Sequence, residues 1–154
     1  MPTKSKRTPA AIREGEDVLS KILADAAPRP TSGSSQSDKN QYAIRFADAF
    51  ATELARDFTP LMDGIEASSR RSAKSDGGTK QLDINFSTPA TGLALGVTLK
   101  SVHIREATGG KRYTHNLKRN GEELMIEASG YHRRQPYAVM VAILALPFDS
   151  CDDA

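Results

Sequence analysis

The sequence predicts an α/β domain of the α+β kind, in which a mixed central sheet is flanked by helices. Three observations support this prediction. Residues 41–58 place Ala43, Phe46, Ala47, Phe50, Leu54 and Phe58 at the spacing of one helix face. Residues 82–87 and 93–100 alternate apolar and polar side chains, as the two strands of a hairpin do. Residues 137–146, YAVMVAILAL, are apolar without alternation, which is typical of a strand covered on both faces.

The order of these elements is helix, hairpin, helix, strand, and it favours a mixed sheet. A helical crossover usually joins two parallel strands, whereas a tight turn joins antiparallel ones. We therefore expect the last strand to enter the sheet through the helix that precedes it.

The first 40 residues differ in composition from the rest of the chain. The 154 residues suit one domain, but the apolar fraction of 38% lies below the roughly 45–50% of ordinary domains. Residues 1–40 are largely small, basic or polar, so we expect them to be mostly disordered, with one short amphipathic helix over residues 10–27. The predicted domain spans residues 41–148, and an acidic tail spans residues 149–154.

The remaining elements follow from helix signals and breakers. Pro60 interrupts the first long helix, and a second helical piece is expected from Leu61 to Ala73. Turns are expected at residues 75–80 and 87–92, and a polar loop over residues 103–116. Asn120 is the expected N-cap of a helix that runs to about Arg134 and stops before Pro136.

Charge and cysteine content exclude some classes of protein. The formal charge is only +2, but the stretch from Lys100 to Arg119 holds six cations and one acid. Such a loop suits a polyanionic ligand, although a solvated surface loop is the plainer interpretation. The single cysteine, Cys151, excludes an internal disulfide and a cysteine-rich zinc site. No secretory signal or bilayer-length apolar run is present, so we expect a cytoplasmic protein without membrane contact.

The hairpin carries the residues of greatest chemical interest. Its alternation places Leu93, Leu95, Val97 and Leu99 on one face and Asp83, Thr98 and Lys100 on the other. An acid and a lysine on the face that also carries Ala94 and Gly96 suggest a metal-dependent phosphodiester site, with room for a backbone to approach. The alternative is a cross-strand ion pair, worth about 0.2–1 kcal/mol.

This arrangement resembles the catalytic core of the PD-(D/E)XK nuclease superfamily, the restriction-endonuclease-like fold. The resemblance covers roughly residues 41–147 and matches Asp83 in QLDINF and Lys100 in GVTLKS. The acid that the family places two residues before the lysine is Thr98 here, so one carboxylate of the metal site must come from elsewhere.

The resemblance implies roles for individual residues. Asp83 and the main-chain carbonyl of Leu99 would bind Mg²⁺, or Mn²⁺ in its place, and Lys100 would act on the attacking water or the phosphate. Glu53 and Glu127 are the leading candidates for the second catalytic carboxylate and metal ligand, ahead of Asp57 and Glu123. The alternatives are an ion pair of Glu53 with Arg45 or Arg56, and a surface ion pair for Glu127.

The loop between the hairpin and the following helix is the expected DNA contact. Lys111, Arg112, Lys118 and Arg119 suit phosphates, and Asn116 and Arg112 could contact base edges. We therefore expect a Mg²⁺-dependent endonuclease for double-stranded DNA, of the site-specific restriction type, and the resemblance implies a homodimer. The alternative is a non-catalytic nucleic-acid-binding or interaction module with a degenerate nuclease fold.

Overall fold

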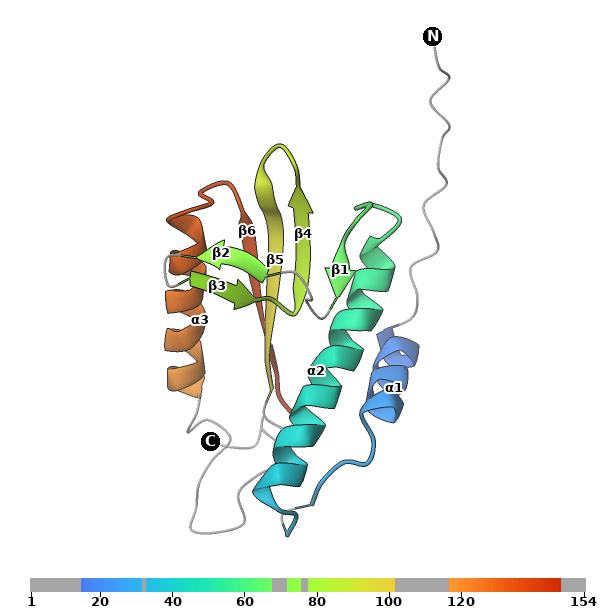
Figure 1. The fold of residues 1–154 in the computed structure, drawn as a ribbon. Coiled ribbons are helices and arrows are strands. Elements are labelled where there is room, and N and C mark those ends of the chain that lie inside the picture. Colours follow the sequence, from blue (N-terminus) through green and yellow to red (C-terminus); the bar gives the residue numbers. More distant parts are fainter. Residues whose placement is uncertain (1–14, 32, 68–71, 76–77, 102–116, 148–154) are drawn as a thin grey trace.

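A computed structural model describes residues 15–31, 33–67, 72–75, 78–101 and 117–147. Its helices are α1 (Gly15–Ala26), α2 (Gln36–Phe58) and α3 (Leu117–His132). Its strands are β1 (Glu66–Ala67), β2 (Ser72–Ser75), β3 (Gly78–Gln81), β4 (Ile84–Thr88), β5 (Gly92–Ser101) and β6 (Val139–Ala145). Helices α1 and α2 lie on one side of the main sheet and α3 lies on the other (Figure 1).

The main sheet is mixed and has the order β1-β4-β5-β6. Strands β1, β4 and β5 are antiparallel neighbours, and β6 joins β5 in parallel after the α3 crossover, with Leu95 opposite Val139 and Ser101 opposite Ala145. The predicted α+β class with a mixed, helix-flanked sheet is therefore confirmed. A separate hairpin of β2 and β3 lies against α3 and was not predicted.

Helix α2 is packed between the sheet and α1. Ser35 is its N-cap and accepts a hydrogen bond from the Asp38 backbone N–H (3.1 Å), which explains a start five residues earlier than position 41. Ile22 and Ala26 of α1 are buried against Tyr42 and Phe46, so packing extends upstream of the expected domain start. The helix predicted over residues 10–27 is described as Gly15–Ala26.

Two predicted helical segments are wrong in position. Residues 61–65 form turns and residues 66–67 and 72–75 form strands, because Pro60 ends α2 and Gly64 takes a left-handed φ of 88°. Helix α3 begins at Leu117, so Asn120 lies inside the helix and is not its N-cap.

Strand β6 is not covered on both faces, contrary to the prediction. It is an end strand of the described sheet, and Val139 and Val141 are exposed. The apolar run therefore does not mark full burial.

A register shift between Phe86 and Ser87 also changes one side-chain assignment in the hairpin. It turns Leu93 toward Leu82 and Tyr131, whereas Val97 faces α2 with Ile84. The predicted shared face of Leu93 and Val97 is therefore wrong.

Candidate functional site

Asp83 lies directly before β4, where the ladder between β4 and β5 ends. Its backbone N–H donates to the Val97 carbonyl (3.0 Å), and its carboxylate Oδ2 accepts from the Leu99 N–H (2.6 Å). The last residue pair of the ladder is Ile84 with Val97. Beyond it, the Leu99 N–H donates to the side chain of Asp83 instead of to a main-chain carbonyl of β4. The local sequence thus fixes the Asp83 carboxylate at the edge of β5.

The Leu99 carbonyl faces the same edge as Asp83. In an extended strand, the N–H and C=O of one residue point to the same side, as paired residues of an antiparallel ladder show by exchanging both bonds. Because the Leu99 N–H points to Asp83, its carbonyl oxygen also lies on that side. One carboxylate and one carbonyl oxygen are therefore directed to the same side of β5.

The electrostatics of Asp83 identify its charged neighbours. Burial raises the pKa of its carboxyl group, and the hydrogen bond from Leu99 and the positive charge of Lys100 act in the opposite direction. The negative charge of Asp48 on α2 raises the pKa further. The charges of Asp48 on α2 and of Lys100 on β5 therefore both act on Asp83.

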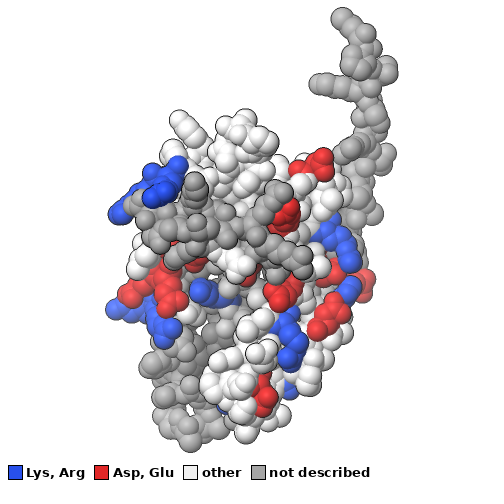
Figure 2. Space-filling model, viewed as in Figure 1, with Lys and Arg blue, Asp and Glu red and all other residues white. Residues whose placement is uncertain are grey.

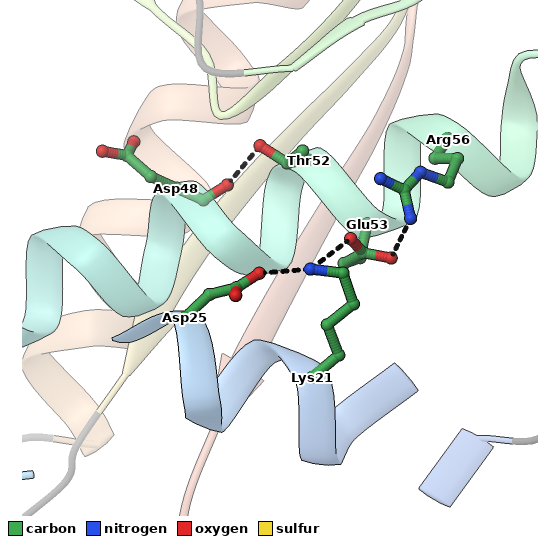
Figure 3. Close-up of polar contacts among 6 residues, drawn as sticks. All are labelled: Lys21, Asp25, Asp48, Thr52, Glu53 and Arg56. Carbon is green, nitrogen blue, oxygen red and sulfur yellow. Dashed lines mark hydrogen bonds and ion pairs between the residues drawn. The ribbon is translucent and has the colours of Figure 1, made fainter. Parts of the chain in front are cut away.

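Asp48 was not among the carboxylates that the sequence suggested. It lies one turn before Ala51 and two turns before Ala55, both of which are buried. Its carboxylate lies on a different side of α2 from Glu53 and α1 (Figure 3). The sequence did contain one signal for Asp48. The small side chains of Ala51 and Ala55 mark the face of α2 that can approach the sheet, and Asp48 lies at the border of that face.

Lys100 connects the Asp83 edge to α3. Its Nζ lies 3.7 Å from Glu123 Oε2, and Glu123 Oε1 accepts a hydrogen bond from Arg119 Nε at 2.9 Å. The Arg119 hydrogen bond and the charges of Arg119 and Lys100 lower the pKa of Glu123. The side chain of Lys100 is 34% exposed and that of Glu123 is 42% exposed, so solvent reaches this end of the site.

Glu53, a leading candidate from the sequence, has a different environment. Its side chain is only 1% exposed, and its carboxylate contacts Arg56 Nη1 at 3.1 Å and Lys21 Nζ at 3.5 Å (Figure 3). The sequence placed Glu53 within the apolar stripe correctly, but this part of the stripe faces α1. The ion pair with Arg56, the alternative considered above, describes Glu53 better than a role beside Asp83. Arg45 instead donates to the Ala26 carbonyl at the end of α1.

Glu127, the other leading candidate, lies one helical turn beyond Glu123. Its charge acts on Tyr131, whose pKa is raised to about 12, chiefly by burial. Glu123, which we ranked lower, is the α3 carboxylate in contact with Lys100. This contact favours Glu123 over Glu127 as the α3 acid nearest to the Lys100 end of the site.

The small residues of β5 do not leave open space. A Cβ at Gly96 would lie 2.9 Å from Leu82 Cδ1 and from Met140 Sδ, so side chains fill the volume in front of this glycine. Thr98 is also buried. A large ligand would have to approach at the Lys100 end of β5, and the predicted room beside Gly96 is absent.

The predicted DNA-binding residues are only partly described. Lys111, Arg112 and Asn116 lie outside the described residues. Lys118 and Arg119 lie in the first turn of α3 and pair with Glu122 (3.9 Å) and Glu123. On the face shown in Figure 2, the described basic and acidic side chains are interspersed.

The donors around Asp83 fit a hard cation only in part. Asp83, the Leu99 carbonyl and Asp48 carry oxygen atoms, the ligand type that Mg²⁺ prefers. Within the described ranges, however, no group of three or more His, Cys, Asp or Glu side chains is arranged to hold a metal ion. Water and phosphate oxygens would have to complete the coordination.

Comparisons with known proteins add no relative. The chain matches no family model, no curated protein and no solved structure. None of the helices in the described part of the chain is long and apolar enough to cross a membrane.

Proposed function

We propose that the chain is a Mg²⁺-dependent endodeoxyribonuclease that hydrolyses phosphodiester bonds of double-stranded DNA, in a variant of the restriction-endonuclease-like fold. One observation carries the proposal: directly before β4, the Asp83 carboxylate is held by the Leu99 N–H and is acted on by the charges of Lys100 and Asp48. The element order α2, β1, β4, β5, α3, β6 supports it, since it contains the helix, hairpin, helix and strand that the resemblance requires.

Each residue of the site would have a separate task. Asp83, Asp48 and the Leu99 carbonyl would hold Mg²⁺, which when bound polarises the phosphate and makes a water molecule more acidic. Lys100 would exchange its contact with Glu123 for a phosphate oxygen and stabilise the negative charge that develops there. Arg119 would keep Glu123 ionised after this exchange, since its hydrogen bond is the first cause of the lowered pKa of Glu123.

Cleavage of supercoiled plasmid in Mg²⁺ or Mn²⁺ tests the proposal. The wild-type chain should nick or linearise the plasmid, and Asp83→Asn, Asp48→Asn and Lys100→Ala should each reduce the rate by a factor of about 10² or more. Asp25→Asn is the matched control, because Asp25 also pairs with a lysine (2.6 Å to Lys21 Nζ) but lies on α1. Equal activity of Asp83→Asn and the control would refute the assignment.

The second candidate function is a non-catalytic nucleic-acid-binding module. Thr98 stands where the resemblance requires an acid, and the described residues contain no cluster of three acidic or histidine ligands. Salt-sensitive DNA binding without nicking in Mn²⁺ would favour this function. If DNA binding is also absent, an interaction module remains.

A further inference from the structure

Strand β6 has an unusual composition for an end strand. Its seven residues, VMVAILA, include no charged residue and no proline. Val139 is 57% exposed and Val141 is 38% exposed, while Tyr137 and Leu146 at its two ends are 92% and 39% exposed. Figure 1 shows β6 beside β5, on the side away from β4.

An end strand presents unpaired N–H and C=O groups, which are a template for another strand. Proteins usually protect such edges with a charged residue, a proline, a bulge or a very short strand. The opposite edge of this sheet has two of these protections, because β1 has only two residues and one of them is Glu66. The β6 edge has none of them among its seven residues.

A second copy of the same strand fits this edge better than other partners. No like charges would meet, because β6 carries none, and head-to-tail growth is disfavoured because β1 offers too short a strand. In an antiparallel pair centred on Ala142, Val139 faces Ala145 of the second copy. Val141 of one copy then faces Ile143 of the other, so apolar side chains of the two strands lie side by side.

We propose that two copies of the chain associate by antiparallel pairing of β6 around a two-fold axis. The product is one continuous sheet to which each copy contributes its four strands. The interface does not involve Asp83 or Lys100, so it can be tested whether or not the chain cleaves DNA.

Sedimentation equilibrium of the full chain measures the association. The expected mass is twice the chain mass of 16.7 kDa, and Val139→Lys should weaken the dimer by at least tenfold. Ile44→Lys is the matched control, because Ile44 on α2 is 54% exposed, close to the 57% of Val139. A monomer at about 100 µM, or a dimer that Val139→Lys does not weaken, overturns the proposal.

Cross-linking provides a second readout if Val139→Lys does not fold. In a Cys151→Ser background, cysteine is placed singly at positions 141, 142 and 143 and the protein is oxidised. Facing residues of an antiparallel pair have Cα atoms about 4.5–5.5 Å apart, which suits a disulfide. At least one position should give a covalent dimer, and Ile126→Cys on α3, where Ile126 is 70% exposed, should not. Absence of a cross-link at all three positions overturns the proposal.

Discussion

Substitutions at the buried ion pair of α2 should have strongly asymmetric effects. Glu53 is 1% exposed, whereas its partners Arg56 and Lys21 are 57% and 44% exposed. When Glu53→Gln removes the carboxylate, both cations can turn to water, and the amide keeps one oxygen as an acceptor. When Arg56→Met removes the nearer cation, the carboxylate stays buried and keeps its longer contact with Lys21.

The magnitudes follow from this difference. Glu53→Gln exchanges charge-assisted hydrogen bonds for neutral ones, and we expect a loss of about 1 kcal/mol in the free energy of unfolding. Removing one partner of a fully buried pair costs about 3–5 kcal/mol. Because Lys21 remains at 3.5 Å, we expect about 2–3 kcal/mol for Arg56→Met.

Urea unfolding followed by circular dichroism at pH 7 measures both free energies. Arg119→Met is the matched control, because its pair with Glu123 is shorter (2.9 Å against 3.1 Å) but lies in solvent. It should cost less than either α2 substitution. A loss in Arg56→Met no larger than in Glu53→Gln would refute the reasoning.

Three further outcomes are expected. Asp83→Asn should keep or raise the melting temperature at pH 7. Burial raises the pKa of Asp83, so its stabilising contribution is lost as pH rises through that folded-state pKa, and asparagine can still accept from Leu99. The pKa of Tyr131 is raised from 10.0 to about 12, so stability should fall between about pH 10 and pH 12 in urea unfolding, and less so in Tyr131→Phe. Gly92→Ala should cost about 1–2 kcal/mol by the same measurement, because Gly92 has a φ of 72° and a Cβ there would lie 2.8 Å from Gln135 Oε1.

The sequence predicted the elements whose patterns are local. The apolar stripe of α2 and the alternation of β4 and β5 specify a helix and a hairpin without reference to the rest of the fold. The elements that were predicted wrongly lie where single residues or short lengths outweigh the hydrophobic pattern. Gly64 and Pro60 prevent a helix after Phe58, and β1 is too short to show any alternation. The exposure of β6 depends on its position at the end of the sheet, which the apolar run of β6 does not specify.

The candidate site was predictable where neighbouring residues form it. Asp83 and Leu99 meet because a hairpin with this register must bring them together. Asp48 and Glu123 reach the site through the packing of α2 and α3, for which the sequence offers only the alanine spacing of α2 as a signal. Glu53 was overvalued because burial of an acid was taken as a sign of metal binding. The position of α1, which supplies Lys21, was outside that reasoning.

The charges around Glu53 and Asp83 distinguish a cation site from an internal ion pair more clearly than the burial of the two acids does. Glu53 has two cations within 3.5 Å, so a further cation would meet positive charge there. The negative charge of Asp48 acts on Asp83. The positive charge of Lys100 also acts on Asp83, but Lys100 contacts Glu123 as well. A cation bound at Asp83 would lower the pKa of Asp83 and offset its repulsion with Asp48. For this reason a cation added to the protein should bind at Asp83 in preference to Glu53, whatever reaction the chain performs. Mn²⁺ should accordingly broaden the NMR signals of Leu99 before those of Lys21. Equal broadening at the two positions would contradict this assignment.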